Sequence, residues 1–231
     1  MKINILEFTE GARRAEGFTV IIDVFRAFSV ACYAYDAGAS SIISTGEVDK
    51  AFALKSIYKN SVLVGERDEK KVSGFDFGNS PTEILGADFK GKTVIHTTTA
   101  GTNGLVNANN ADEIITGSLV NASAIVRYIK KMDPSVVSLV AMGYRATESA
   151  AEDLLCARVI EAGLKNNKID IKSETEALRQ TSGKRFFLPE NEEFSPASDF
   201  FLCTMMDRFD FVLIGLKRDD GNISLIREFP L

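Results

Sequence analysis

The chain has 231 residues, of which 45% are hydrophobic and 26% are charged, with no Trp and one His. This composition is typical of a globular protein with a sizeable core. The net charge of -5 disfavours nucleic-acid partners, which usually need a basic excess. No apolar run approaches the ~20 residues of a membrane span, and Glu7 comes too early for a signal peptide. We therefore expect a cytoplasmic protein without nucleic-acid or membrane partners.

The first part of the chain alternates short β-favouring runs with helical patterns. Strands are predicted at 3–8, 19–24, 40–44, 61–65, 92–98, 113–116 and 136–142. Helices are predicted at 27–37, 48–58, 101–109, 122–132 and 147–165, and a polar turn over 10–17. Repeated β-then-α units are typical of an α/β fold with a largely parallel sheet and helices on its faces.

The remainder of the chain breaks this alternation. Residues 167–209 are polar, contain Pro189 and Pro196, and have room for two helices. Apolar runs at 211–216 and 223–227 flank a turn-forming stretch, which predicts a β-hairpin. The simplest interpretation is one domain over 1–231, with a core over 1–166 and a C-terminal elaboration over 167–231. The three cysteines lie in apolar helical segments and are expected to be buried free thiols.

An acid and a base follow the apolar run Thr19–Ile22. Asp23 is expected at the carboxyl end of a buried strand, and Arg26 in the first turn of the next helix. Ligands of open α/β sheets bind outside the carboxyl ends of the strands, where this pair is suited to a metal ion and an anion. A purely structural ion pair between strand and helix explains the two residues equally well.

Two more strand ends carry similar groups. Glu66 and Arg67 follow the run 62–65, and a Thr- and Gly-rich turn over 97–104 leads into a helix. Hydroxyls, backbone N–H groups and a helix N-terminus would converge in that turn, as in an anion site. A tight turn with capping threonines is the structural alternative.

The segment 75–83 and the helix at 147–165 add further candidates. Asp76, Asn79 and Ser80 carry oxygen-bearing side chains beside Gly78, although Ser80 or Asn79 also fits as a helix cap before Pro81. Glu152 and Asp153 lie next to an apolar stripe and are harder to explain by capping. With Asp23 and Glu66 they would form an oxygen-rich site suited to Mg²⁺, with Arg26, Arg67 and Arg145 binding anionic oxygens.

Several common motifs are excluded. The 97–104 turn is followed by no Gly-Lys-Ser/Thr sequence, so it is not a P-loop, and it lacks the Gly-x-Gly-x-x-Gly pattern of dinucleotide sites. Asp23-Val24-Phe25 lacks the second acid of Asp-x-Asp phosphatases, and no cysteine stands five residues before an arginine in a phosphate loop. The single His96 rules out dinuclear metallophosphatases and zinc sites of several histidines.

The order and spacing of these motifs resemble the 2-phosphosulfolactate phosphatase family. The resemblance covers about residues 19–165. Its motifs are Ile22–Ala27, Gly65–Arg67, Gly74–Pro81, the Thr97–Gly104 turn, Gly117–Ala122 and Glu152-Asp153. The turn departs from the family's pattern because no Arg follows Thr102, and Gly143–Thr147 replaces a Gly-rich turn.

The resemblance implies a three-layer α/β/α fold and a Mg²⁺-dependent hydrolysis of 2-phosphosulfolactate to 3-sulfolactate and phosphate, a step in coenzyme M biosynthesis. The expected roles are catalysis by Asp23, Arg26, Glu66 and Arg67, and metal binding by Asp23 and Glu66 together with Glu152 or Asp153. The expected substrate-binding residues are Asp76, Gly78, Asn79, Ser80, Thr98, Thr99, Gly101, Thr102, Asn121 and Arg145.

Several alternatives stay open. Asp23 can hold the metal or attack phosphorus as a nucleophile that forms an aspartyl-phosphate. The protein can act on another small anionic phosphomonoester, or bind anionic metabolites without catalysis. The sequence does not determine the oligomeric state, for which a homodimer is only the general prior.

Overall fold

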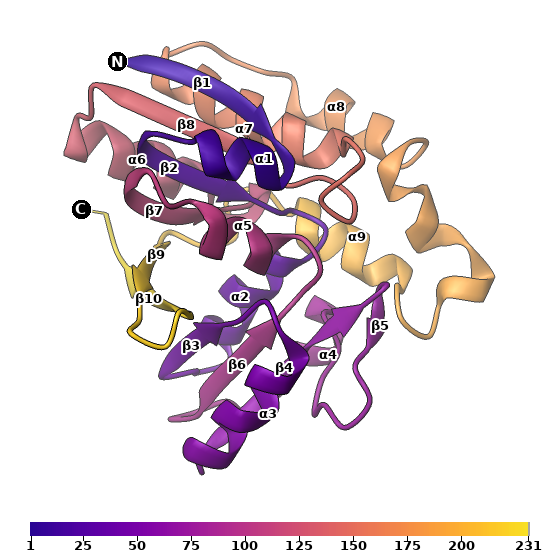
Figure 1. Ribbon diagram of the computed structural model, residues 1–231. Coiled ribbons are helices and arrows are strands. Elements are labelled where there is room, and N and C mark those ends of the chain that lie inside the picture. Colours follow the sequence, from indigo (N-terminus) through magenta and orange to yellow (C-terminus); the bar gives the residue numbers. More distant parts are fainter. Residues whose placement is uncertain (231) are drawn as a thin grey trace.

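The computed structural model describes residues 1–230, which form an α/β fold with one ten-stranded sheet (Figure 1). Its strands are β1 (Lys2–Glu7), β2 (Gly17–Ile22), β3 (Ser41–Ser44), β4 (Ser61–Arg67), β5 (Lys70–Lys71), β6 (Thr93–Thr97), β7 (Ala111–Gly117), β8 (Val136–Ala141), β9 (Val212–Lys217) and β10 (Ile223–Glu228). Its helices are α1 (Phe8–Arg14), α2 (Ala27–Asp36), α3 (Val48–Ile57), α4 (Pro81–Ile84), α5 (Gly101–Asn107), α6 (Ala122–Met132), α7 (Ala151–Leu164), α8 (Ile171–Leu178) and α9 (Ala197–Thr204), with 3₁₀ helices η1 (Leu119–Asn121), η2 (Ser182–Phe187) and η3 (Pro189–Asn191).

The sheet consists of two parallel blocks joined by the C-terminal hairpin. The strand order is β1-β8-β2-β7-β9-β10-β3-β6-β4-β5, and the first four strands and the group β3-β6-β4 are each parallel within themselves. The strands β9 and β10 pair antiparallel with each other, with β7 and with β3. The predicted α/β fold and hairpin are confirmed, and the hairpin lies in the middle of the sheet rather than outside it.

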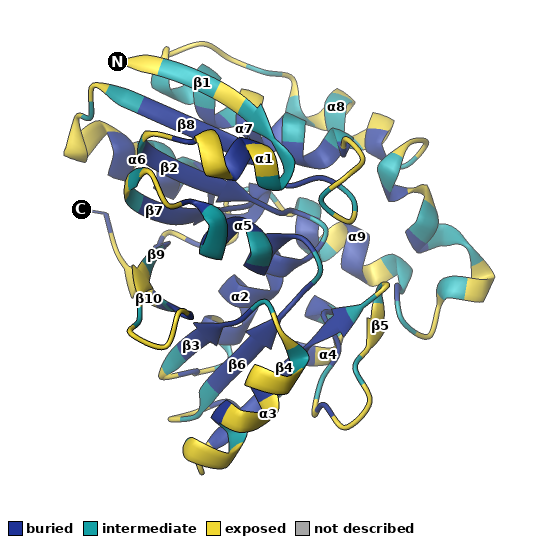
Figure 2. Ribbon diagram, in the orientation of Figure 1, coloured by how far each residue is buried: buried dark blue, intermediate teal, exposed yellow. Residues whose placement is uncertain are grey.

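Strand β2 shows why its sequence is an unbroken apolar run. Val20 and Ile22 pack in one hydrophobic cluster with α6 and α7, whereas Ile21 packs in a second cluster with α2 and α5. Since successive side chains of a strand point to opposite faces, burial on both faces requires apolar residues at every position. Figure 2 shows β2 and β6 buried along nearly their whole length.

Some local predictions were wrong. The expected polar turn over 10–17 is largely helix α1, whose Ala12 is fully buried in the cluster that also contains Ile21 and α2. The helix expected from 147 begins only at Ala151, because a short loop follows β8. All three cysteines are free and buried, as predicted. None of the helices within residues 1–230 combines the length and apolarity of a membrane-crossing segment.

Candidate active site

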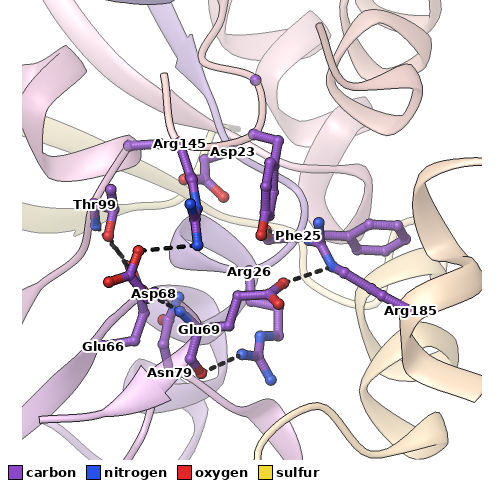
Figure 3. Close-up of a pocket in the computed structure, with 13 residues that line it drawn as sticks. Asp23, Phe25, Arg26, Glu66, Asp68, Glu69, Asn79, Thr99, Arg145 and Arg185 are labelled. Atoms are coloured by element: carbon purple, nitrogen blue, oxygen red, sulfur yellow. Dashed lines mark hydrogen bonds and ion pairs between the residues drawn. The ribbon is translucent and has the colours of Figure 1, made fainter. Parts of the chain in front are cut away.

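The carboxyl ends of strands from both parallel blocks surround one pocket (Figure 3). Its wall comes from the residues after β2, β6 and β8, from the end of β4 and the turn that follows, and from η2 of the C-terminal region. The lining residues are Asp23, Phe25, Arg26, Glu66, Asp68, Glu69, Asn79, Thr99, Ala100, Gly143, Tyr144, Arg145 and Arg185. Its position is the one at which open α/β sheets bind ligands.

Asp23 directly follows β2 and is only 6% exposed. Its Oδ1 accepts a hydrogen bond of 3.0 Å from the backbone N–H of Ala27, which fixes the carboxyl at the start of α2. Within residues 1–230 its hydrogen bonds use Oδ1 alone, so Oδ2 keeps its acceptor capacity. Burial raises the pKa of Asp23 to about 7, and the negative charges of Glu66 and Glu152 act in the same direction.

Glu66 is the second carboxylate of the pocket wall. Its Oε1 accepts a hydrogen bond of 2.6 Å from the Thr99 N–H, and its Oε2 accepts one of 2.9 Å from the Glu69 N–H. The Thr99 hydroxyl also donates to Oε2, at 3.2 Å. These donors hold the carboxylate between the β6–α5 loop and the turn after β4. The sequence-predicted residues Asp23, Glu66 and Thr99 therefore come together in one pocket.

The two acids of α7 have different surroundings, although they are neighbours in sequence. Both oxygens of Asp153 are occupied, because Oδ1 accepts from the Val24 N–H at 2.8 Å and Oδ2 from the Gly143 N–H at 2.9 Å. Asp153 thus ties the loop after β2 to the loop after β8, and lies behind the pocket wall. Glu152 is also buried, and its Oε2 has no hydrogen-bond partner within residues 1–230. Burial raises the pKa of both carboxyls.

Arg26 lines the pocket but is held from behind by the C-terminal region. It is the N-cap residue of α2 rather than part of its first turn. Its Nη1 donates to Asp199 Oδ2 and to the Phe194 carbonyl, both at 2.7 Å, and its Nη2 donates to the Glu69 carbonyl at 3.2 Å. Arg26 is 4% exposed and Asp199 is fully buried, so this ion pair is shielded from solvent.

Two further arginines reach the pocket from other loops. Arg145 follows β8, with its guanidinium 5.3 Å from the centre of the Tyr144 ring. Arg185 comes from η2 and was not identified from the sequence. Its Nη2 donates to the Phe25 carbonyl at 3.2 Å, and the Tyr144 ring centre lies 5.1 Å away. The pocket is therefore lined by three guanidinium groups and by four carboxylates, those of Asp23, Glu66, Asp68 and Glu69. Guanidinium groups are donors suited to an anionic ligand.

Asn79 is oriented by the single histidine of the chain. The Oδ1 of Asn79 lies 3.2 Å from His96 Nε2, which therefore carries the proton and donates it. Burial lowers the pKa of His96 to about 4, so the ring is neutral at physiological pH. Since Oδ1 is occupied, the amide NH₂ of Asn79 is the group available to a ligand in the pocket.

Several residues predicted from the sequence to bind ligand make their hydrogen bonds and ion pairs outside the pocket. Arg67 donates to the carbonyls of Glu66 and Gly46 and to the Thr97 hydroxyl. Asp76 accepts from the Leu63 N–H at 2.7 Å and pairs with Lys55. In each case the side chain secures strand β4 or β6, and neither residue is among those that line the pocket.

The structural roles that the sequence offered as alternatives, helix capping by Ser80 and closure of the 97–104 turn by its threonines, are both seen in the structure. Ser80 caps α4, and its hydroxyl donates to Asp199. Thr98 and Thr102 bond to each other, with Thr102 Oγ1 donating to the Thr98 carbonyl at 2.8 Å. Asn121 donates to the Phe211 carbonyl and makes no capping bond with its side chain.

The two glycines of the predicted site have different positions. Gly78 lies in an adjoining hollow beside Asn79, where its N–H donates to Glu83 at 2.8 Å. Gly101 packs directly against the catalytic candidate, since a Cβ atom at this position would lie 2.8 Å from Asp23 Oδ2. The absence of a side chain at residue 101 therefore leaves room for the Asp23 carboxyl.

The donor set at the pocket fits Mg²⁺. Residues 1–230 contain no preassembled group of three or more His, Cys, Asp or Glu side chains placed to hold an ion. However, Mg²⁺ is usually held by one or two carboxylates, with water and substrate phosphate as its remaining ligands. Asp23 and Glu66 provide two carboxylates, and the unpartnered Oε2 of Glu152 lies buried behind them.

Comparisons with known proteins point to one family. Residues 4–215 match the family model described as 2-phosphosulpholactate phosphatase. The chain is 31% identical over 210 residues to a protein of Bacillus subtilis (strain 168) named probable 2-phosphosulfolactate phosphatase, and the match covers 90% of each chain. A protein of the same name from Caldanaerobacter subterraneus subsp. tengcongensis is 34% identical over 207 residues, covering 84% of this chain and 85% of the relative.

Proposed function

The chain belongs to the 2-phosphosulfolactate phosphatase family, and from this premise we propose that it hydrolyses 2-phosphosulfolactate to 3-sulfolactate and phosphate. The observation that carries the proposal is the placement of Asp23, a buried carboxyl with one unengaged oxygen, in a pocket that also contains Arg26, Arg145 and Arg185. The substrate carries a phosphate, a sulfonate and a carboxylate, and guanidinium groups bind all three kinds of oxyanion.

The arginines and Asn79 would bind and orient the substrate. Arg26 is fixed by the buried Asp199, so its direction is set before the substrate arrives. Arg145 and Arg185 are partly exposed and lie beside aromatic rings, and they would bind oxyanions in place of the acids Asp68 and Glu69 with which they are paired. The amide NH₂ of Asn79 would donate to a further substrate oxygen. Binding of this kind aligns the phosphorus with the carboxyl of Asp23.

Asp23 and Glu66 would hold Mg²⁺, with water and phosphate oxygens completing its coordination. When bound, the ion supplies charge neutralisation and polarisation of the phosphoryl group. The hydrogen bonds from Thr99 and Glu69 keep the Glu66 carboxylate in place for this role. Asp153 would act indirectly, by holding the loops that present Asp23 and Tyr144.

A second role for Asp23 is consistent with the same geometry. Its Oδ2 would then attack phosphorus as the ester P–O bond breaks, and 3-sulfolactate would leave as an alkoxide that takes a proton from water. A second water would hydrolyse the resulting aspartyl-phosphate to phosphate and the free Asp23 carboxylate. A single turnover of substrate radiolabelled at phosphorus, quenched in acid, distinguishes the two roles. Label found on Asp23 supports the covalent route, whereas label found only in the released phosphate supports direct attack by water.

The proposed function is tested by phosphate release from 2-phosphosulfolactate, measured with Mg²⁺ and after its removal by a chelator. We expect release that requires Mg²⁺ and that falls by at least about a thousandfold in Asp23→Ala. Equal turnover of phosphomonoesters that lack the sulfonate would favour another substrate for this pocket. Tight binding of the compound without any phosphate release would instead identify a non-catalytic binder.

A further inference from the structure

Both partly exposed arginines of the pocket are paired with acids from one short turn. Asp68 and Glu69 are the two residues between β4 and β5. Asp68 Oδ1 lies 3.0 Å from Arg145 Nη2, and Glu69 Oε1 lies 2.9 Å from Arg185 Nε. Figure 3 shows each of the two acids facing its arginine, and all four residues line the pocket. Both guanidinium groups are therefore already paired with a carboxylate by charge, although Arg185 Nε has no hydrogen-bond partner within residues 1–230.

The sequence of the turn is unusual for its geometry. The φ angles of Asp68 and Glu69 are 51° and 69°, and two-residue hairpin turns with two positive φ angles strongly favour Asn-Gly or Asp-Gly. Asp fits the first position, but the second position has Glu where glycine is preferred. Glu adopts this conformation at a cost, so contacts with the surrounding structure must hold the residue in it.

The backbone of Glu69 connects the turn to the rest of the site. Its N–H donates to Glu66 Oε2 at 2.9 Å, and its carbonyl accepts from Arg26 Nη2 at 3.2 Å. Glu69 thus contacts Glu66, Arg26 and Arg185 at once. A displacement of this turn would change the contacts of all three.

The two ion pairs differ in their exposure to water. The side chains of Arg185 and Glu69 are 18% and 20% exposed, whereas those of Arg145 and Asp68 are 49% and 73% exposed. Exposed ion pairs contribute little because water and salt screen them. The pair between Glu69 and Arg185 is therefore the main internal competitor for an incoming anion, and the outer pair is the weaker one.

We propose that the Asp68-Glu69 turn is an internal anion that occupies the pocket arginines until a substrate displaces it. This inference rests on the proposed function and refines it, since Glu69 takes the place of an anionic group of the substrate other than its phosphate. The preferred substrates are phosphomonoesters that carry a second anionic group able to reach Arg185. After the reaction the turn returns to the arginines and favours product release.

The test compares the binding of inorganic sulfate to the metal-free protein and to Glu69→Gln, by titration calorimetry. Glutamine keeps the size and the backbone contacts of residue 69 but removes the competing charge. We expect sulfate to bind roughly three- to tenfold more tightly to Glu69→Gln, and less than about threefold more tightly to Asp68→Asn. Glu174→Gln, which removes an exposed acid paired with Arg158, is the matched control and should leave sulfate affinity unchanged.

Equal or weaker sulfate binding by a folded Glu69→Gln protein overturns the proposal. If that variant does not fold, Glu69→Asp decides the matter, because it keeps the charge but draws it back from Arg185. Tighter sulfate binding by Glu69→Asp supports the internal competitor, and unchanged binding rejects it. The proposed function is judged separately, because a wild-type protein that hydrolyses no phosphomonoester contradicts only that function, while the sulfate comparison keeps its meaning.

Discussion

Asp199 Oδ2 lies 2.7 Å from Arg26 Nη1, although 173 positions separate the two residues in the chain. The other oxygen of Asp199 accepts from the Ser80 hydroxyl and from the N–H and hydroxyl of Thr82. One buried carboxylate therefore connects the C-terminal helix α9 to α4 and to the pocket arginine. The C-terminal region is therefore part of the site, because its Asp199 holds the pocket residue Arg26 in place.

We expect Asp199→Asn to destabilise the protein by about 3–5 kcal/mol, because it leaves the buried Arg26 guanidinium without its counterion. The misplaced guanidinium should also lower kcat/KM by at least about tenfold. Urea denaturation and steady-state kinetics measure the two effects. As a control, Asp36→Asn removes a half-exposed partner of Arg208 and should change stability by less than about 0.5 kcal/mol. An Asp199→Asn protein of wild-type stability and activity would contradict this assignment.

The buried carboxyl of Asp23 is expected to make the stability of the folded protein depend on pH. Burial raises its pKa from 3.8 to about 7, so between these pH values the folded state binds the proton more tightly than the unfolded state. Stability contributed by this group is therefore present at low pH and is lost as the pH rises towards 7. Asp23→Asn cannot ionise and escapes the loss, which amounts to at most about 4 kcal/mol at 1.36 kcal/mol per pKa unit.

The measurement is the thermal unfolding temperature of the metal-free wild type and of Asp23→Asn over pH 4–8. We expect the variant to be the more stable protein at pH 8 and nearly equal to the wild type at pH 4. A stability difference that does not change with pH would show that Asp23 ionises as freely in the folded as in the unfolded state. The same variant should lack phosphatase activity at every pH.

The features that were predictable from the sequence are those with local causes. The run Thr19–Ile22 identified β2 and the position of Asp23, because burial on both faces leaves a continuous apolar signal. The order of the motifs identified the family, which the comparisons confirm. By contrast, Arg185 lies in a polar segment without a motif, and its place in the pocket depends on tertiary packing. The central position of the β9–β10 hairpin likewise depends on non-local strand pairing.

The adjacent acids of α7 show a second limit of prediction from sequence, which is that it does not reveal the partners of a side chain. Successive residues of a helix point about 100° apart, so Glu152 and Asp153 point in different directions although they are adjacent in sequence. The sequence does not reveal that Asp153 meets two backbone N–H groups. The threonines of the 97–104 turn pose the same problem, since hydroxyls that bind an anion and hydroxyls that close a turn have the same sequence pattern.

Gly101 is predicted to tolerate no side chain. A Cβ atom there would lie 2.8 Å from both Asp23 Oδ2 and Ala27 Cβ, which is closer than such atoms approach in proteins. We expect Gly101→Ala to displace the carboxyl, lower kcat by at least about tenfold and destabilise the fold by about 1–3 kcal/mol. In Gly46→Ala the added atom meets only the end of the Asn103 side chain, which can rotate, so this control should remain active. Full activity of Gly101→Ala would show that the Asp23 position is not critical.

His96 is predicted to be a positioning residue that acts through Asn79. Its Nε2 lies 3.2 Å from Asn79 Oδ1, and burial lowers its pKa to about 4, so it donates as a neutral ring. We expect His96→Phe to raise KM several-fold with a smaller change in kcat, because Asn79 loses its orientation but the reacting groups do not move. His96→Gln, whose amide N–H can still donate, should restore much of the loss.

Two readouts separate this role from simple core packing. Because His96 is already neutral, the pH profile of kcat/KM between pH 5 and 9 should be the same shape in the wild type and in His96→Gln. If His96 only fills space, KM should instead follow side-chain volume and stability, so that Phe and Gln variants of equal stability bind substrate equally well. That result would remove His96 from the binding machinery, whereas a KM rescued by Gln and not by Phe identifies the hydrogen bond to Asn79 as the functional contact.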